Sequence, residues 1–190
     1  MLGRAEWIKF IAAFYNKEAL AAKVFDGIVA QYQTYQNLAS NISTDKTPTV
    51  FSGTLWRGTW FMSGGKTYIV QLIKDAGGNY LWSDNDSRQT LPLDFEVVYD
   101  RAHNADHWLP MRNDWTAMEN VSSTDPRYES FNAFKKGQIS NANARLTEHG
   151  GNDYFEMGLI EPHLILADMI KIFHPELLPD YKLKYHQKLK

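Results

Sequence analysis

Apolar residues recur at helical spacing through the first part of the chain. They form two sets separated by Asn16, a residue that can interrupt a helix, and together comprise Trp7, Ile11, Phe14, Phe25, Ile28, Tyr32, Tyr35 and Ala39. This spacing predicts helix over residues 5–40, either as one kinked helix or as two helices. A polar stretch at residues 41–48 ends the pattern.

Beyond residue 48, short apolar runs alternate with amphipathic stretches. The runs predict strands at residues 49–53, 79–82, 106–109 and 138–141. The stretches predict helices at residues 63–76, 94–105, 125–136 and 162–173. Ser63 and Asp94 are the expected N-caps of the first two of these helices, and Gly77-Gly78 is the expected stop of the first.

This alternation of strands and helices is typical of βαβ units around a parallel sheet. We therefore predict an α/β fold, a three-layer sandwich with a mostly parallel central sheet like that of a Rossmann-like lobe. The long helical backbone segment at residues 1–40 is expected to precede this lobe, which spans residues 41–190.

The loops that follow the strands of a parallel sheet emerge at one edge, where ligands bind. Four such loops are predicted, at residues 53–62, 83–93, 110–124 and 142–161. They carry three of the six tryptophans and four arginines, namely Trp56, Trp60, Trp115, Arg57, Arg88, Arg112 and Arg145. Aromatic rings beside guanidinium groups suit a large, flat or anionic organic ligand. Each tryptophan could equally cap the core, because this residue is usually mostly buried.

Composition adds mainly exclusions. The 190 residues carry a net charge of −2, and no run of like charge indicates a nucleic acid or a membrane surface as partner. The absence of cysteine excludes disulfides, thiolate catalysis and cysteine metal sites. Of the six histidines, His103 and His107 are four residues apart, but no third metal ligand is obvious. We also find no catalytic triad, so neither a metal, a cofactor nor a catalytic residue is predicted.

The sequence Ser-Gly-Gly-Lys-Thr at residues 63–67 is close to a phosphate-binding loop. The full pattern places a glycine five positions before the second one, where this chain has Trp60, and an indole cannot make that tight turn. The alternative is that Gly64-Gly65 lets the chain approach another backbone segment or an anionic ligand closely.

Glu96 lies in the first turn of the helix predicted at residues 94–105. A carboxylate there complements the helix dipole. If that helix start lies on the ligand edge, Glu96 is also well placed to pair with an arginine of a docking partner. The residues alone leave both roles open.

Four segments resemble a known family: RAEWIKFIAAFYNKEALA, PTVFSGTLWRGTWFMSGGKTYIVQLIKDAGGNYLW, LPLDFEVVYDRAHNADHWL and GGNDYFEMGLIEPHLILADMIKIFHPELLPD. They are similar to the C-terminal part of the substrate-binding proteins of ABC importers, in the helical-backbone class that serves ferric siderophores, haem and vitamin B12. The resemblance implies two α/β lobes joined by a long helix, with the ligand held between the lobes. It also implies a binding protein with no catalysis.

The resemblance assigns roles to several positions. It makes the loop around Trp60 one wall of the cleft and makes Glu96 the carboxylate that docks onto the membrane permease. With the aromatic and arginine residues of the predicted edge, the expected ligand-binding residues are Trp56, Trp60, Met62, Ser63, Arg88, Trp115 and Tyr154.

The chain is expected to lack the N-terminal lobe of the family, which leaves apolar residues of the first helix uncovered. Self-association, as a homodimer, is an expected consequence. The expected location is the periplasm or another extracytoplasmic, membrane-anchored position. One alternative is a small α/β enzyme, a hydrolase or a nucleotide-using protein, with its site at the same edge. Another is a stand-alone interaction domain whose partner covers the first helix.

Overall fold

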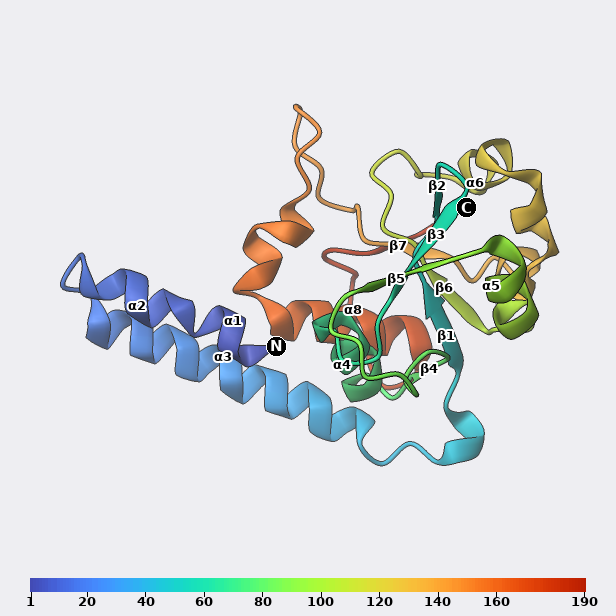
Figure 1. Cartoon of the computed structure of the whole chain (residues 1–190). Helices are drawn as coiled ribbons and strands as arrows, with labels where there is room; N and C mark the ends of the chain where they lie inside the picture. Colours follow the sequence, from blue (N-terminus) through green and yellow to red (C-terminus); the bar gives the residue numbers. More distant parts are fainter.

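The computed structural model describes all 190 residues and begins with a helical hairpin. Helices α1 (Leu2–Ala5) and α2 (Trp7–Ala13) run antiparallel to α3 (Glu18–Ala39), as Figure 1 shows. The hairpin turns at Asn16, which has a positive φ of 51°. Asparagine tolerates this left-handed conformation better than most residues do. The predicted helical segment is therefore interrupted at Asn16, with α1 and α2 before it and α3 after it.

The centre of the lobe is a three-stranded parallel sheet. Its strands β1 (Thr49–Ser52), β4 (Asn79–Tyr80) and β6 (His107–Leu109) are ordered β4-β1-β6. Helix α4 (Tyr68–Asp75) follows β1, and α5 (Phe95–Ala102) precedes β6. The crossover through α4 leads from β1 to β4, and the crossover through α5 leads from β4 to β6, in the opposite direction along the sheet. Right-handed connections therefore place α4 and α5 on opposite faces of the sheet. The prediction of an α/β fold with a parallel sheet is confirmed.

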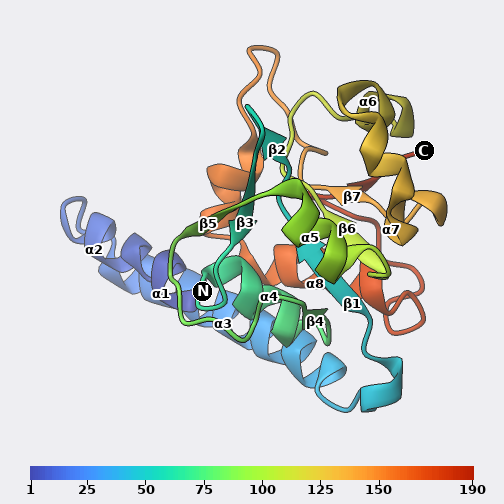
Figure 2. The same ribbon diagram turned by 45° about the vertical axis from the view of Figure 1, so that its right-hand side comes forward.

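Helix α8 (Pro162–Phe173) joins the hairpin to the lobe by packing against both α3 and α4. On α4, the Asp75 carboxylate accepts hydrogen bonds from the Tyr32 hydroxyl at 2.6 Å and from the Gln36 amide at 2.9 Å, both of α3. These bonds fix the register of α3 on the lobe. Figures 1 and 2 show the α2 end of the hairpin projecting away from the lobe.

The segment after β1 differs from the prediction. Instead of entering a helix at Ser63, it forms the hairpin of β2 (Leu55–Trp56) and β3 (Thr59–Ser63), and β3 pairs antiparallel with β5 (Thr90–Leu93). The predicted helix starts five residues late, at Tyr68. Ser63 lies at the end of a strand because residues 59–63 alternate between buried and exposed positions, which suits a strand and not a helix.

The other elements are short. The predicted helix at residues 125–136 is split into two pieces, and a helix at residues 118–124 was missed. The remaining elements are η1 (Thr44–Lys46), α6 (Met118–Thr124), η2 (Pro126–Ser130), α7 (Asn132–Lys135), β7 (Ser140–Asn141), η3 (Asp153–Phe155), η4 (Met157–Leu159) and β8 (Gln187–Lys188).

The C-terminal segment is held by Asp168, a fully buried carboxylate of α8. It accepts hydrogen bonds from the backbone N–H groups of Lys184, Tyr185 and His186 at 2.7–2.8 Å. Burial alone would raise the pKa of Asp168, but the hydrogen bonds from His186 and the backbone outweigh burial and lower it. The ionised carboxylate thus positions the chain end so that β8 pairs with β7.

The core of the lobe is aromatic. Trp60 from the hairpin packs on Phe51 of β1 and Trp108 of β6, with ring centroids 6.0 and 5.6 Å apart. Tyr128 and Phe131 complete the cluster, at 5.0 and 5.7 Å from Trp108. Because this cluster lies directly beneath the hairpin, it fixes where the hairpin stands over the sheet.

Candidate functional site

The chain crosses from β1 to β4 on one side and then from β4 to β6 on the other side of β1, so the switch point of the sheet lies between β1 and β6. Ligands are expected at the carboxyl ends of these two strands. The β2–β3 hairpin follows β1 at this point, and residues 110–117 follow β6. The hairpin turn, Arg57-Gly58, has positive φ at both residues, 51° and 84°. Two such residues make the tight turn whose twist matches that of paired strands.

The hairpin presents two aromatic rings to solvent at this edge. Trp56 is 58% exposed and Phe61 is 43% exposed. Two hollows, of about 300 and about 340 Å³, lie against Trp56, and Arg112 borders both of them. The first hollow is lined by Gly53, Thr54, Trp56, Phe61, Ser63, Thr90, Met111 and Arg112. We take this surface, centred on Trp56 and Arg112, as the candidate site and call it the hairpin edge.

Arg112 is held rigidly in place. Its guanidinium donates to both carboxylate oxygens of Asp114, at 2.8 and 2.6 Å, and lies 5.6 Å from the centre of the Trp115 ring. Hydrogen bonding to Asp114 raises the pKa of Arg112, which stays charged. Arg57, at the hairpin tip, forms no salt bridge and adds a free positive charge beside the second hollow.

Two of the predicted ligand residues on β3, Trp60 and Met62, are fully buried and have no face toward the edge. The Trp60 indole N–H donates to the Ser52 carbonyl at 2.9 Å, inside the lobe. Alternation along the strand turns these two side chains inward and turns Phe61 outward. Ser63, also predicted, is half-buried and lines the first hollow.

The other predicted residues are scattered. Trp115 is fully buried, and its indole N–H donates to the Thr124 hydroxyl at 2.9 Å. Tyr154 is also buried, and burial raises the pKa of its hydroxyl, which has no hydrogen-bond partner. Arg88 is exposed but borders neither hollow. Of the seven predicted ligand residues, the structure places only Trp56 and Ser63 on the hairpin edge.

Sequence reasoning missed Phe61 and Met111. The alternating pattern of residues 59–63 could have identified Phe61 as the outward residue of a strand. The segment at residues 142–161 adds three exposed apolar side chains, Leu146, Phe155 and Met157. In Figures 1 and 2 this segment rises on the same side of the lobe as β2.

Glu96 lies in the first turn of α5 with its side chain 80% exposed. Its closest charged neighbour is Arg127, whose Nη1 is 3.8 Å from the carboxylate oxygen. The Arg127 guanidinium also pairs with Asp125 at 2.8 Å and lies over the Phe95 ring at 4.1 Å. An exposed pair of this length is weak, so Glu96 can exchange it for another partner.

The Gly-Gly-Lys segment is not a phosphate cradle. Its backbone N–H groups are already used: those of Gly64 and Lys66 donate to the Gln89 and Ser87 carbonyls at 3.1 and 2.9 Å, and that of Gly65 donates to Asn85 Oδ1 at 3.0 Å. A Cβ at Gly64 would lie 2.4 Å from the Gln89 oxygen. The two glycines therefore admit another backbone segment, as one of the two sequence alternatives predicted.

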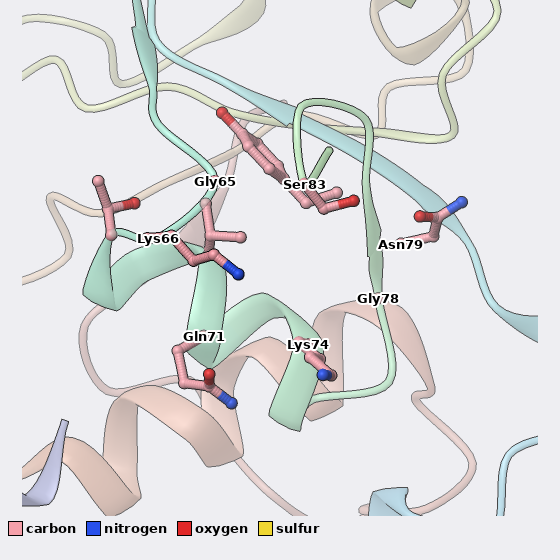
Figure 3. Close-up of a pocket in the computed structure, with 10 residues that line it drawn as sticks. Gly65, Lys66, Gln71, Lys74, Gly78, Asn79 and Ser83 are labelled. Carbon is pink, nitrogen blue, oxygen red and sulfur yellow. The ribbon is translucent and has the colours of Figure 1, made fainter. Parts of the chain in front are cut away.

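A hollow of about 480 Å³, larger than either hollow of the hairpin edge, lies beside this segment. Figure 3 shows Lys66 just before α4 and Gln71 and Lys74 on it, with Asn79 and Ser83 across the space. Its lining is mostly polar, and the Lys66 ammonium lies 3.5 Å from the exposed Asp86 carboxylate. Because it lies along the edge strand β4 and not between β1 and β6, and lacks aromatic surface beyond Tyr80, we favour the hairpin edge.

No group of three His, Asp or Glu side chains has the arrangement needed to hold a metal ion. None of the helices combines the length and apolar character needed to cross a membrane.

Comparison with known proteins agrees with this geometry. The chain is 26% identical over 191 residues to the uncharacterized lipoprotein MJ0878 of Methanocaldococcus jannaschii, covering 98% of this chain and 42% of that protein. The chain spans about half the length of the curated relatives it matches.

Two solved structures share the fold. The TroA-like periplasmic binding protein FepB of Veillonella parvula superposes with a TM-score of 0.70 at 17% identity, over 96% of this chain and 55% of that one. The periplasmic haem-binding protein RhuT of a Roseiflexus species gives 0.70 at 18% identity, over 91% and 62%. At these identities the likeness shows the fold alone. The family model described as periplasmic binding protein, however, matches residues 2–146, most of the chain. The protein therefore belongs to the periplasmic binding protein family, a family of substrate-binding proteins and not of enzymes, as the sequence resemblance predicted.

Proposed function

We propose that the chain serves as the C-terminal lobe of the substrate-binding component of an ABC importer, and that its hairpin edge contacts an iron complex. A ferric siderophore or haem is the favoured ligand, and a cobalamin, which also carries a large metal-binding macrocycle, is a further candidate. The ligand is captured between this lobe and a second lobe and is then delivered to a membrane permease. The protein works on the extracytoplasmic side, held at the membrane.

The observation that carries the proposal is the pairing of exposed rings with fixed positive charge at the switch point of the sheet. Trp56 and Phe61 offer faces on which a conjugated macrocycle or an aromatic chelate can stack. Arg57 supplies an unpaired charge for carboxylate or hydroxamate oxygens, and Arg112, whose charge Asp114 offsets, supplies a fixed guanidinium beside it. Two open hollows on one lobe suit a ligand that is enclosed only when another lobe closes over it.

Relatives support the ligand class. The structurally similar RhuT is a haem-binding protein by its description, and a further similar structure belongs to an Fe3+-hydroxamate transport system. The relative MJ0878 is described as a lipoprotein, which fits a membrane-anchored position. These properties belong to those proteins, and we extend them to this chain as part of the proposal.

For docking we assign Glu96, because its carboxylate is exposed at the start of α5 and its hold on Arg127 is weak. An arginine of the permease would replace Arg127 as its partner. In liposomes carrying the cognate importer, Glu96→Arg should abolish transport while ligand binding stays unchanged. Normal transport by Glu96→Arg would remove Glu96 from the docking role.

The ligand assignment is tested by titrating the chain with haemin, a ferric hydroxamate siderophore and cyanocobalamin while following tryptophan fluorescence. We expect quenching by at least one of the three. Trp56→Ala should remove most of the quenching, and Phe61→Ser should weaken binding roughly tenfold, which corresponds to the ~1.4 kcal/mol of one lost ring contact.

Val97→Ser is the matched control for Phe61→Ser, because Val97 is an exposed apolar residue of α5 that borders neither hollow. It should leave all three titrations unchanged. Absence of quenching by all three ligands, or equal loss in Val97→Ser and Phe61→Ser, would contradict the proposal.

A further inference from the structure

A hollow of about 380 Å³ lies at the opposite end of the sheet from the hairpin edge. Strands β6, β7 and β8, the end of α8 and the segment after it contribute to its lining, and we call it the β6–β7 hollow. His107 lines it as the first residue of β6, whereas the hairpin edge follows the last residues of β1 and β6. In Figure 1 the chain enters β1 at the lower end of the sheet and reaches β2 at the upper end.

The two ends of the chain lie away from this hollow. No residue before His107 contributes to its lining. Lys190 lies beside α6, where its carbonyl accepts a hydrogen bond from the Met118 N–H at 3.0 Å. A lobe that closes over the hairpin edge stands at the other end of the sheet. The exposure of the hollow therefore depends neither on the first helices nor on a second lobe.

Two of the side chains that line the hollow are buried polar groups without a partner in the protein. His107 is 8% exposed and Ser140 is 3% exposed. His107 Nδ1 is enclosed without a hydrogen bond, and the Ser140 hydroxyl forms none with another residue. Because Trp108 pairs with Ile139, strand alternation turns His107 and Ser140 to the same face of the sheet. Two unpartnered polar groups on one buried face are costly unless a ligand or water bonds to them.

Two lysines bring positive charge to the hollow. Lys171 of α8 donates its three N–H bonds to carbonyl oxygens of residues 175–179, at 2.9–3.3 Å. Lys188 of β8 donates one to Gln138 Oε1 at 3.1 Å and keeps two further donors. Neither ammonium has a carboxylate within 4.0 Å, and the lining includes no Asp or Glu. An anion in the hollow would therefore meet two charges that no acidic residue offsets.

His107 is a donor to this hollow and not a further charge. Burial lowers the pKa of His107 to about 4, and the charge of Lys188 also lowers it, against the opposing effect of Asp106. The ring is therefore neutral near pH 7 and carries a single N–H. Nδ1 has no surface that a ligand can reach, so Nε2 is the nitrogen available to the hollow. With its proton on Nε2, the ring donates a hydrogen bond.

The remaining lining is largely apolar. The Phe173 ring is buried, and its centre lies 5.3 Å from that of the His107 ring. Ile172 and Leu183 are half-buried and add aliphatic surface. The volume falls within the roughly 300–1,000 Å³ of small-molecule pockets. Apolar walls beside donors and positive charge suit an organic anion better than a bare inorganic one.

We propose that the β6–β7 hollow is a second ligand site, which binds a small organic acid. The carboxylate accepts hydrogen bonds from His107 Nε2, the Ser140 hydroxyl and the Lys188 ammonium. The apolar body of the acid lies against Phe173 and Leu183. Because this site and the hairpin edge lie at opposite ends of the sheet, both can be occupied at once.

Nuclear magnetic resonance of the isotope-labelled chain tests the ligand class. Benzoate and hexanoate are the probes, benzyl alcohol is the uncharged match for benzoate, and inorganic phosphate is the match for an anion without an apolar body. At least one of the two acids should shift the amide signals of residues 107, 138–140 and 171–173. Benzyl alcohol and phosphate should bind at least tenfold more weakly than that acid.

Variants test the residues. Lys188→Gln and Ser140→Ala should each weaken binding of the acid about fivefold or more. Lys23→Gln is the matched control, because it removes the same charge from an exposed lysine of α3 that does not line the hollow. His107→Leu should abolish binding and leave the thermal unfolding midpoint unchanged or raised, because it removes an unpartnered buried polar group.

Three results would overturn the proposal. The first is the absence of shifts at residues 107, 138–140 and 171–173 with both acids, which would leave only water as the partner of His107 and Ser140. The second is equal binding of benzyl alcohol or phosphate. The third is an equal loss of affinity in Lys23→Gln and Lys188→Gln.

Discussion

Trp60 and Phe61 are neighbours on β3, yet they belong to different regions of the molecule. Trp60 points inward and packs on Phe51 and Trp108. Phe61 points outward, with Trp56 beside the same hollow. The two regions, an aromatic core and an aromatic edge, are separated only by the thickness of one strand. An aromatic residue in a loop-like sequence is therefore no guide to a ligand site until the alternation of the strand is known.

The largest expected difference lies between Trp60→Ala and Trp56→Ala. Removing the fully buried Trp60 ring should lower the free energy of unfolding by about 3–5 kcal/mol, because it leaves a cavity in the core. Removing the exposed Trp56 ring should change it by no more than about 0.5 kcal/mol. Urea denaturation measures both, and a Trp56→Ala variant as unstable as Trp60→Ala would break the distinction between core and edge.

The next comparison concerns two glycines of the same hairpin. Gly53 has a φ of 77°, and a Cβ there would lie 2.1 Å from the Phe61 carbonyl oxygen. Gly53→Ala should therefore displace the hairpin and cost about 2–4 kcal/mol. Gly58 has a φ of 84° but no neighbour within 4 Å, so Gly58→Ala should cost only the backbone strain, about 1 kcal/mol.

Thermal unfolding of the two variants measures this difference. Ligand quenching should fall in Gly53→Ala, because the hairpin carries Trp56, and persist in Gly58→Ala. Equal stabilities would mean that the hairpin does not sit as closely over β1 as the structure shows.

The smallest effect is expected at Arg57, which adopts a left-handed conformation with a φ of 51°. Asparagine is a better residue for this position of a two-residue hairpin turn, so Arg57→Asn should stabilise the protein by about 0.5–1 kcal/mol. Chemical denaturation of the ligand-free protein at low ionic strength is a suitable measurement. A loss of stability would show that the Arg57 side chain, 5.8 Å from the Trp56 ring, contributes more than its backbone strain costs.

The sequence predicted the parallel strands and α8 well, because their periodicity is carried by consecutive residues. Residues 162–173 were predicted as one helix, and they form α8 over the same range. Asn16 was correctly identified as the point where the first helices could separate. In each case a local signal decided the local structure.

The hairpin could not be predicted in the same way. Its first strand has two residues, and its turn begins with arginine instead of the asparagine or glycine that marks such turns. Ser63 followed by two glycines resembles a helix start, yet pairing with β5, far along the chain, makes it the end of a strand. The burial of Trp115 and Tyr154 likewise depends on contacts with distant segments, which no local pattern carries.

The central claim is that the ligand contacts the hairpin edge and not the larger polar hollow beside α4. Hydrogen–deuterium exchange of the chain, with and without whichever of haemin, the ferric hydroxamate siderophore and cyanocobalamin quenches its fluorescence, tests this claim directly. We expect slower exchange at residues 53–63 and 110–116 on binding, with residues 64–83 unchanged. Protection confined to residues 64–83, or to α2, would contradict it.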